Sequence, residues 1–530
     1  MDMARLLPIG IQDFTDIRER GFCYVDKTPV IHRLITGSGK AFFLSRPRRF
    51  GKSLLCSTLR AIFEGRRELF GEVDGRPGLA IDSLDWGWKR HPVIRLDLNA
   101  GVYSNGVEAL HTSLTRELKR EAKRHGVDLD GGDCGSQFAS LIEQSCDKYG
   151  ERTVVIIDEY DKPLLETMDQ PEIHDQIRKE LKGFYGVLKS SDEFLRFVFI
   201  TGVTKFAHVS IFSDLNMLSD LTLDPRYADI CGWRQEEVEQ NFGPEIEAVL
   251  TKTDRERGQY MEELRQYYNG YRFSEEPPTV YNPFGLLNHF DKGGKFSPYW
   301  YETGSPSFLI KLIQKQKINI LNLNNLRIGY ENFYKFDIES MDAVTVLYQS
   351  GYLTISNYDQ KREKFVLDYP NLEVRSSFSK SLIGQYLMVS KESANTLFNK
   401  LPDSLLDGDI GGAIDALRQL LASVPYDIIK ETENYYQTAV HLIFTIFGLK
   451  CRSEVRIADG RIDTLVETSN FVYCFEFKLD KSADEALAQI NTKDYLLPWT
   501  GSGKKLFKVG VDFDSEKRNI GEWKYETAEG

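Results

Sequence analysis

Residues 41–53 read Ala-Phe-Phe-Leu-Ser-Arg-Pro-Arg-Arg-Phe-Gly-Lys-Ser. The first four are an apolar run, a basic loop follows, and Ser53 opens an amphipathic stretch that continues to Phe63. A strand, a loop and a helix in this order place the backbone N–H groups of the helix start around a bound phosphate. Lys52 then reaches the outer phosphates of a nucleotide, and the Ser53 hydroxyl ligates Mg²⁺. The segment therefore predicts a phosphate-binding loop, although the first glycine usual in such loops is replaced here by Arg46. The alternative is a chance Gly-Lys-Ser at a helix start.

Two adjacent acids end a second apolar run. Residues 154–157 are Val-Val-Ile-Ile, and Asp158 and Glu159 follow directly. An aspartate at the tip of a buried strand can hold the Mg²⁺ shell, and a glutamate beside it can polarise the attacking water. We therefore expect Asp158 to bind the metal and Glu159 to act in hydrolysis. The alternative is a strand followed by a solvated acidic turn.

A third apolar run, residues 197–201, leads into a polar segment that contains Thr204. The polar end of this strand can meet the γ-phosphate, with Thr201 or Thr204 as the sensor. Strand capping is an equal alternative for either threonine. Among these two we assign Thr204 to the nucleotide site.

Short apolar runs alternate with charged helical segments such as 106–124 over the first part of the chain. This alternation predicts an α/β fold with a largely parallel sheet over residues 1–234. Residues 235–398 are mostly helical and rich in aromatics, and we expect a helical lid followed by a winged-helix-like region with a small hairpin. The Asp, Gly and Pro content of 399–412 predicts an exposed linker, and 413–530 form a last, strand-rich domain.

Composition bounds the class of protein. The chain has 530 residues, too many for one core, and its net charge of -12 argues against indiscriminate coating of nucleic acid. No apolar run approaches the roughly 20 residues of a membrane span, so we expect no membrane partner. The seven cysteines contain no C-x-x-C pair, which indicates reduced thiols in a cytoplasm, and the eight scattered histidines argue against zinc.

A second candidate site lies near the carboxyl end. Residues 460–467 and 471–478 predict two strands joined by a tight turn. Side chains alternate along a strand, so Glu476 and Lys478 face the same side. Asp463 and Glu476, one from each strand, can then converge on one Mg²⁺ or Mn²⁺, the metals that hard oxygen ligands favour. Lys478 can orient or deprotonate a water and stabilise a pentacovalent phosphate.

The flanking segments favour this interpretation over a plain surface hairpin. A helix at 434–447 before the hairpin, a helix at 483–495 after it and a strand at 506–512 give an αβββαβ order. The alternative is a half-exposed hairpin in which an acid and a base pair across solvent.

The first part of the chain resembles the AAA-ATPase-like family of bacterial and archaeal proteins. The segments that carry the resemblance are Asp26-Lys27-Thr28, residues 46–53, 157–161, 201–206, 281–284 and 300–304. The family is similar to the ASCE division of P-loop NTPases, and a basic loop without the first glycine is one of its traits. The resemblance implies that ATP is bound by Arg48, Arg49, Phe50, Gly51, Lys52, Ser53, Asp158 and Thr204. It also implies that Phe14 and Tyr24 border the adenine, with ordinary core aromatics as the alternative.

The carboxyl-terminal segment, with Asp463 and Glu476-Phe477-Lys478, resembles the PD-(D/E)XK nuclease superfamily. By this resemblance Glu433 is an additional metal or water ligand and Gln489 lines the site, with plain surface positions as the alternative for both.

Together the two resemblances imply an ATP-binding and ATP-hydrolysing switch coupled to a metal-dependent nuclease, in genome defence or mobile-element control. We expect a nucleic-acid partner, DNA ahead of RNA, and leave a homo-oligomer open. The rivals are a carboxyl-terminal domain that clamps nucleic acid without cutting and one that binds a protein partner.

Overall fold

The computed structural model describes residues 6–73, 75–205, 211–212, 215–304, 306–316, 318, 323, 325–334, 342–386, 400–422, 450–457 and 460–529. The chain forms two compact units. The first comprises residues 1–303 and 327–371, and the second comprises 304–326 and 372–530. The region 235–398, expected as one lid and winged-helix-like segment, is therefore divided between the two units.

A five-stranded parallel sheet is the centre of the first unit. Its order is β2-β3-β4-β1-β5. The strands are β1 (Ala41–Ser45), β2 (Val93–Asp97), β3 (Thr153–Asp158), β4 (Leu195–Gly202) and β5 (Leu218–Asp220). Every residue of β1 and β3 is buried, as expected for parallel strands covered on both faces. The expected α/β fold is confirmed, and β4 lies between β1 and β3, as in the ASCE type of P-loop fold.

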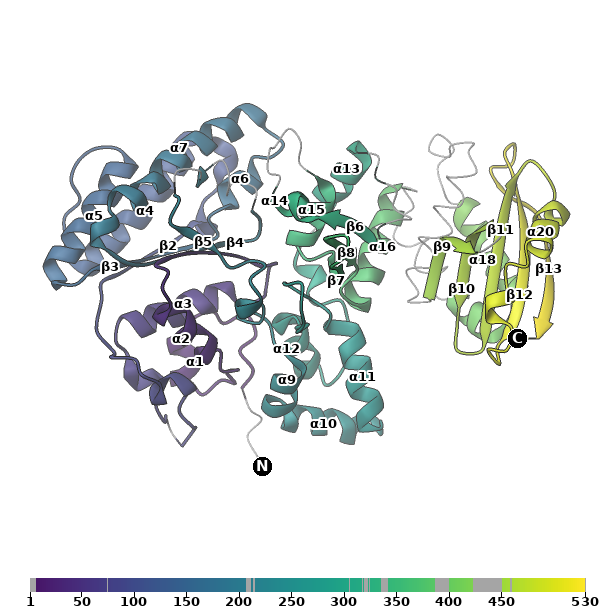
Figure 1. The fold of residues 1–530 in the computed structure, drawn as a ribbon, viewed down its shortest axis with the longest axis horizontal. Coiled ribbons are helices and arrows are strands. Elements are labelled where there is room, and N and C mark those ends of the chain that lie inside the picture. Colours follow the sequence, from purple (N-terminus) through teal and green to yellow (C-terminus); the bar gives the residue numbers. More distant parts are fainter. Residues whose placement is uncertain are drawn as a thin grey trace. The chain divides into compact units, whose positions relative to one another are not determined.

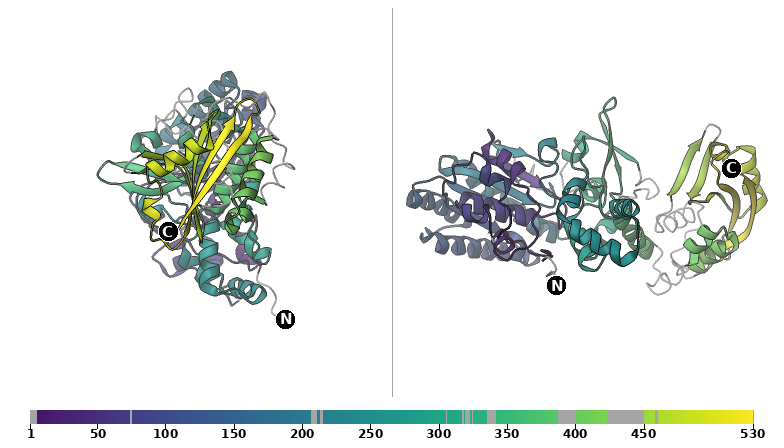
Figure 2. Two further views of the ribbon diagram at one scale, coloured as in Figure 1. Left: turned by 90° about the vertical axis from the view of Figure 1, so that its right-hand side faces the viewer. Right: turned by 90° about the horizontal axis from the view of Figure 1, so that it is seen from below.

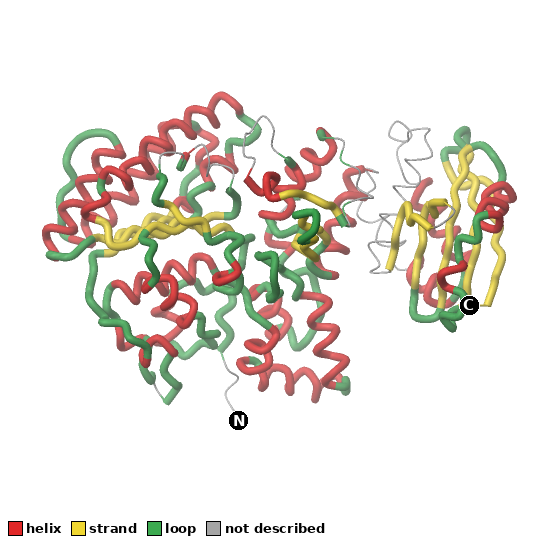
Figure 3. The backbone as a smooth tube through the Cα atoms, viewed as in Figure 1, coloured by secondary structure: helices red, strands yellow, loops and turns green. Residues whose placement is uncertain are grey.

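Helices cover both faces of this sheet (Figures 1 and 3). One layer contains α4 (Val107–His125), α5 (Cys134–Tyr149), α6 (Lys162–Glu166) and α7 (Pro171–Ser190). The other contains α1 (Phe14–Glu19), α2 (Thr28–Thr36) and α3 (Lys52–Phe63). The first layer packs on the sheet through one continuous apolar core, which fixes the carboxyl ends of the strands.

The rest of the first unit is a helical region and a small sheet. The helices are α9 (Gln235–Asn241), α10 (Gly243–Thr253), α11 (Arg257–Tyr268) and α12 (Pro283–Asp291). They share an aromatic core that also takes in Cys23 and Val25 from the amino-terminal segment. The expected hairpin is present as β7 (Thr354–Asp359) and β8 (Lys364–Asp368), and β8 also pairs with β6 (Leu326–Gly329). The neighbouring helices are α14 (Tyr330–Tyr334) and α15 (Ala343–Gln349).

A second five-stranded sheet forms the centre of the second unit (Figure 2). Its strand order is β13-β12-β11-β10-β9. The strands are β9 (Lys450–Ile457), β10 (Gly460–Glu467), β11 (Phe471–Leu479), β12 (Lys505–Asp514) and β13 (Asn519–Glu529). Only β11 and β12 are parallel, because α20 (Ala483–Thr492) makes the crossover between them. Gly510 lets this helix approach, since a Cβ there would lie 2.4 Å from the Ala483 carbonyl oxygen. The unit also contains α13 (Ser307–Lys315), α16 (Leu372–Tyr386) and α18 (Ile410–Ala422).

The segment expected as an exposed linker is packed instead. Residues 400–407 are helical, and Leu401 and Leu405 are buried. The Tyr473 hydroxyl donates to the Leu405 carbonyl, and a Cβ on Gly408 would lie 3.1 Å from the ring of Phe471. The linker was expected from the Asp, Gly and Pro content. That content conceals Leu401 and Leu405, which are spaced as on one face of a helix and are buried in the second unit.

None of the helices in the described ranges combines the length and apolar character that crossing a membrane requires. Residues 434–447, expected as a helix, lie outside the described residues, as does residue 399 of the expected linker.

Candidate functional sites

A cavity of about 310 Å³ lies at the carboxyl end of β1. We call it the loop cavity. One side is lined by residues 48–53, together with Glu159 and Asn99, and is polar and charged. The other side is mainly apolar and is lined by Tyr24, Val25, Ile31, Leu54, Leu55, Ile230, Trp233, Pro283, Phe284 and Leu287. A cavity with one charged and one apolar end matches a ligand that joins a polyphosphate to an aromatic base.

The backbone of the loop adopts the conformation needed to surround an anion. Arg49 and Gly51 have φ values of 64° and 92°, and Gly51 is the N-cap of α3. Phe50 is buried against the rings of Tyr271 and Phe273, which anchors the loop from the side away from the cavity. Residues 51–53 at the start of α3 line the loop cavity, where the N–H groups and the dipole of a helix N-terminus favour negative charge.

Lys52 lies at the charged end of the loop cavity. Its Nζ donates to the carbonyl oxygens of Arg46 (3.1 Å) and Pro47 (3.2 Å) and is 3.7 Å from Glu159 Oε1. The side chain is buried, so these neutral carbonyls and one carboxylate are weak substitutes for a phosphate group.

Arg46, the residue that replaces the usual glycine, does not enter the loop cavity. It is fully buried, and its guanidinium donates to the carbonyl oxygens of Ser45, Thr222 and Tyr227 at 2.9–3.0 Å. It also lies 4.2 Å from the ring centroid of Phe273. Burial lowers its pKa, with nearby anionic groups acting in the opposite direction. Arg46 is thus a structural tie between the loop and residues 222–227, which the sequence pattern did not reveal.

Asp158 has the features of an unsatisfied metal ligand. It is fully buried at the end of β3, and neither carboxylate oxygen has a hydrogen-bond partner among the described residues. The nearest cation is Arg95, whose Nη2 lies 3.6 Å from Oδ2. Burial, and then the charge of Glu159, raise the pKa of Asp158 to about 6, while the neighbouring Ser53 hydroxyl, which lies outside hydrogen-bond geometry, lowers it. A carboxylate with free lone pairs next to a serine hydroxyl fits a hard cation such as Mg²⁺.

Glu159 reaches the loop cavity through a strained backbone. Its φ is 53°, a conformation that a non-glycine residue adopts only at some cost. The carboxylate is partly exposed, lines the loop cavity and is the group closest to Lys52 in that lining. The structure therefore brings Glu159 and Lys52 to the same end of the loop cavity.

The two threonines of the third apolar run are committed elsewhere. The Thr204 hydroxyl and N–H donate to Asp161 Oδ2 at 2.6 and 2.7 Å, and the Thr201 hydroxyl donates to the Leu44 carbonyl at 2.7 Å. Neither residue lines the loop cavity. Asp161 is fully buried, and burial and the charge of Glu159 raise its pKa. Thr204 therefore belongs to a network that fixes the loop after β4, and the structure does not bring it to the cavity.

Of the two aromatics expected at the base end, Tyr24 lines the loop cavity. Phe14 lies in the core behind it, stacked on Phe70 with ring centroids 4.8 Å apart. Asn99 and Thr303 also line the cavity and were not expected there. The sequence signal for Asn99 is its position two residues after β2, at the same edge of the sheet as Asp158, and Thr303 belongs to the segment 300–304 that carries part of the family resemblance.

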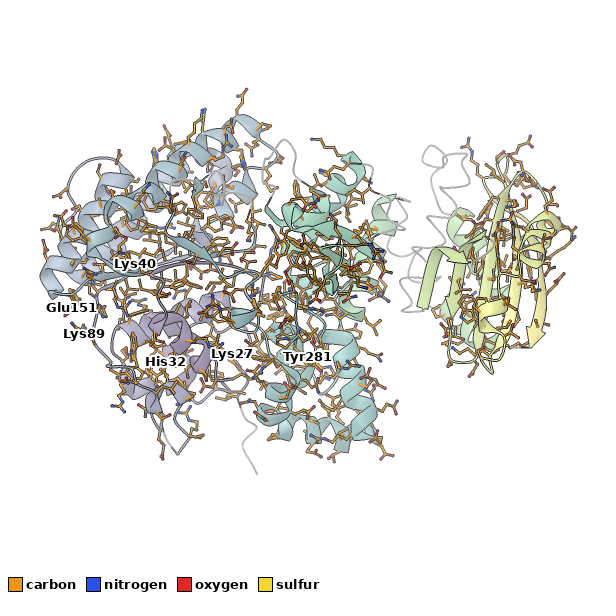
Figure 4. The ribbon with its side chains drawn as sticks, in the orientation of Figure 1. Lys27, His32, Lys40, Lys89, Glu151 and Tyr281 are labelled. Carbon is orange, nitrogen blue, oxygen red and sulfur yellow. The ribbon has the colours of Figure 1, made fainter. Side chains whose placement is uncertain are left out.

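The helical region closes the rim of the loop cavity. Lys27 forms an ion pair with Glu237 of α9 at 2.6 Å, and the Tyr281 hydroxyl donates to Gln235 of α9 at 2.7 Å. Figure 4 labels Lys27 and Tyr281. Trp300 donates from Nε1 to the Arg48 carbonyl at 2.9 Å. These contacts hold the loop and the apolar lining as one structure.

The second candidate site lies on β10 and β11, and we call it the hairpin site. It consists of Asp463, Glu476 and Lys478. The strands are antiparallel with Thr464 opposite Phe475, so Asp463 comes opposite Glu476 one step further along. Asp463 Oδ2 accepts a hydrogen bond from the Phe477 N–H at 3.0 Å, and Lys478 Nζ donates to Glu476 Oε1 at 3.1 Å. The three side chains therefore meet as the alternation of the strand predicts.

Glu476 resembles Asp158 in its electrostatics. It is buried, and its Oε2 has no hydrogen-bond partner among the described residues. Burial, and then the charge of Asp463, raise the pKa of Glu476 to about 7, although Lys478 lowers it. Within the described ranges no three His, Cys, Asp or Glu residues form a metal-binding group. Two neighbouring carboxylates, of which Glu476 keeps one oxygen without a hydrogen bond, still suit a hard divalent cation that keeps several waters.

Gln489 of α20 joins the hairpin site. Its Nε2 donates to Glu476 Oε1 and to the Tyr495 hydroxyl, the latter at 3.1 Å, and its Oε1 accepts from Lys478 Nζ at 2.8 Å. The expected place of Gln489 at the site agrees with this geometry. Tyr495 was not expected, and Glu433 lies outside the described residues.

Both parts of the chain are similar to known proteins. Residues 8–212 match the family model described as "Predicted AAA-ATPase", and residues 431–523 match that of the PD-(D/E)XK nuclease superfamily. The chain is 36% identical over 527 residues to a protein of Azotobacter chroococcum mcd 1 described as "Uncharacterized protein in vnfD 5'region". The match covers 97% of each chain.

Proposed function

This chain belongs to the family of predicted AAA-ATPases that end in a domain of the PD-(D/E)XK nuclease superfamily, and on that premise we propose that it binds and hydrolyses ATP and cuts nucleic acid. We propose Mg²⁺ as the metal of both sites, with Mn²⁺ as a substitute at the hairpin site, and DNA rather than RNA as the polymer. The ATPase acts as the switch, in the cytoplasm, and the nuclease as the effector in genome defence or mobile-element control.

At the loop cavity, residues 48–53 hold the phosphates and the apolar lining holds the base. Lys52 exchanges its two carbonyl partners for phosphate oxygens, a stronger charge-assisted bond. Ser53 and Asp158 would hold Mg²⁺, which neutralises charge on the phosphates when bound. Glu159, released from Lys52 by this exchange, accepts a proton from the attacking water.

At the hairpin site, Asp463 and Glu476 would hold the divalent ion, which acts as a Lewis acid on the scissile phosphate when bound. Lys478 orients the attacking water and stabilises the charge that develops on the phosphate. The side-chain amide of Gln489 contacts both Lys478 and Glu476 and holds them in position. Because burial and Asp463 raise its pKa to about 7, Glu476 would hold the ion only in its deprotonated form.

The observation that carries the proposal is the pair of buried carboxylates with unpaired oxygens. Asp158 and Glu476 each lie fully or almost fully buried beside a second acid and a lysine. A buried carboxylate without its hydrogen bonds is costly, so a site that keeps one is suited to a cation.

The test is incubation of purified protein with duplex DNA, single-stranded DNA and RNA, with and without Mg²⁺ and ATP. Metal-dependent cutting that is lost in Glu476→Ala and Lys478→Ala supports the proposal. If wild type binds nucleic acid but never cuts it, the carboxyl-terminal domain is a clamp. If the protein shows no nucleic-acid binding that weakens steeply with salt, a protein partner is favoured instead.

A further inference from the structure

Helix α4 presents a basic face to solvent. Arg116, Lys119, Arg120, Lys123 and Arg124 are all exposed, at the spacing of one helical face. No carboxylate among the described residues forms an ion pair with Lys119 or Lys123. This face is unusual for a chain with a net charge of -12.

The acids of the same stretch are turned inward. Glu117 and Glu121 are buried, and their Oε2 atoms accept from the N–H groups of Asp97 and Arg95 on β2, at 3.4 Å each. β2 is an edge strand, so these carboxylates satisfy N–H groups that have no neighbouring strand. The acids thus serve the sheet edge while they also form ion pairs with Arg116, Arg120 and Arg124, and Lys119 and Lys123 form no ion pair among the described residues.

A hollow of about 340 Å³ adjoins this face at the edge of β2. Its lining is Arg60, Arg95, Asp97, Arg120, Glu121 and Arg124. Arg124 pairs with Glu64 at 2.5 Å and Arg120 with Glu117 at 2.8 Å, so those charges are partly balanced. Arg95 is different: its Nε is buried without a hydrogen bond among the described residues, and its nearest carboxylate is Asp158 at 3.6 Å.

Arg95 therefore lines the hollow and also lies within 3.6 Å of Asp158, the candidate magnesium ligand, which is buried and is not in the lining of the loop cavity. It lies on β2 next to β3, where Arg95 pairs with Ile156, two residues before Asp158. A guanidinium binds phosphate in a bidentate way more strongly than it holds a carboxylate at a distance beyond hydrogen-bond length. An anion in the hollow would thus compete with Asp158 for Arg95.

We propose that the outward face of α4 and the adjoining hollow bind the phosphate backbone of nucleic acid, and that occupancy of the hollow is transmitted through Arg95 to Asp158. The inference rests on the proposed function in one respect, because the nuclease-superfamily domain makes nucleic acid the polyanion this chain encounters. Residues 116–124 cover about 12 Å at the rise of an α-helix, enough for two or three successive phosphates of one strand.

The first experiment measures binding of the full chain to a fluorescent DNA duplex by anisotropy, in EDTA and without nucleotide, over a range of salt. The double variant Lys119→Ala/Lys123→Ala should bind about tenfold more weakly, and its log K against log salt slope should be smaller by about two. Lys179→Ala/Lys189→Ala removes two exposed lysines from α7 and is the charge-matched control. Equal binding by the α4 variant and wild type would overturn the proposal, as would polyglutamate displacing the duplex at equal charge and the same salt.

The second experiment measures ATP hydrolysis with and without the duplex. The α4 double variant should keep the basal rate of wild type and lose the change that the duplex produces. A duplex effect of the same size in wild type and variant would contradict transmission from this face. Because the binding assay needs neither cutting nor hydrolysis, it separates this proposal from the proposed function. A chain that binds through α4 but never cuts DNA would sink only the nuclease assignment.

Discussion

The loop cavity and the hairpin site each place a lysine beside two acids, but they obtain these residues in different ways. In the hairpin site, Glu476 and Lys478 lie two positions apart on one strand, and Asp463 faces them from the next strand. At the loop cavity, Lys52 comes from the start of α3, which follows β1. Asp158 and Glu159 come from the end of β3, and β4 lies between β3 and β1. The hairpin site is set by hairpin register, the other by the order of a whole sheet.

This difference has energetic consequences. At the hairpin site the lysine and the acid are already in hydrogen-bond contact, whereas in the loop cavity Lys52 lies beyond that distance from Glu159 and is held by carbonyls. We therefore expect the hairpin site to respond most strongly when one of its residues changes, and the loop cavity to separate binding from hydrolysis. The following predictions test this contrast, from the largest effect to the smallest.

Glu476→Ala or Asp463→Ala should reduce metal-dependent DNA cleavage by at least about 10³-fold, because each removes a metal ligand and the charge that polarises the phosphate. Cleavage rates at matched metal and salt are the measurement. ATP hydrolysis in the absence of DNA should stay within about twofold of wild type, since the two sites are built from separate sheets. Undiminished cutting in Asp463→Ala would place the chemistry elsewhere.

Glu159→Gln should lower ATP turnover by about 10²-fold while leaving ATP affinity nearly unchanged. The amide fills the same space but cannot accept a proton from water, and Lys52 loses only a carboxylate at 3.7 Å. Single-turnover hydrolysis and equilibrium nucleotide binding give the two readouts. Equal turnover in wild type and variant would remove Glu159 from its role.

Lys52→Ala should weaken ATP binding by about 30-fold, corresponding to ~2 kcal/mol for a charge-assisted contact with phosphate. The fold should persist, because Lys52 is held only by two backbone carbonyls and a distant carboxylate. Lys182→Ala, an exposed change on α7, provides the control. If the variant binds ATP as tightly as wild type, the loop does not hold the phosphates.

The metal-free protein should become less stable as pH rises. The pKa of Glu476 is raised from 4.5 to about 7. Between these two pH values the folded state therefore holds a proton that the unfolded state has released. Stability contributed by this group is therefore full below pH 4.5 and is lost as pH rises through 7. After allowance for solvent at the site, the loss should be about 1 kcal/mol.

Glu476→Gln cannot lose this proton, so it should be more stable than wild type at pH 8 and equal to it at pH 4.5. Unfolding in EDTA, followed calorimetrically at both pH values, measures the difference. A stability gain of Glu476→Gln that did not change with pH would contradict the titration and point to packing instead.

Local patterns predicted most of the hairpin site. Alternation along a strand and the length of the turn suffice to bring Asp463, Glu476 and Lys478 together. Gln489 was expected there only from the resemblance to the nuclease superfamily. The strand, loop and helix around Lys52 were equally local. These features needed no knowledge of distant contacts.

Features that depend on distant contacts were missed. Thr204 was expected at the nucleotide because it follows a strand, but Asp161 accepts both its hydroxyl and its N–H. The helix at 400–407 was not predicted, because the Gly and Asp content of the segment is typical of a linker. The helix is stabilised by the packing of Leu401 and Leu405 in the second unit. The outward bases of α4 were visible only as a charged segment. That its acids turn inward follows from β2 being an edge strand.

Arg46 has a consequence for protein engineering. The loop that ends in Gly-Lys-Ser is often treated as a portable module, a short cassette that any strand and helix can carry. Here the cassette is anchored by a buried guanidinium that needs the carbonyls of Thr222 and Tyr227 and the ring of Phe273, all far along the chain. A graft of residues 45–53 onto a foreign scaffold would bring in a buried cation without its acceptors. To be transplanted, this loop must either travel with residues 222–227 and 273 or have Arg46 exchanged for the glycine of simpler loops.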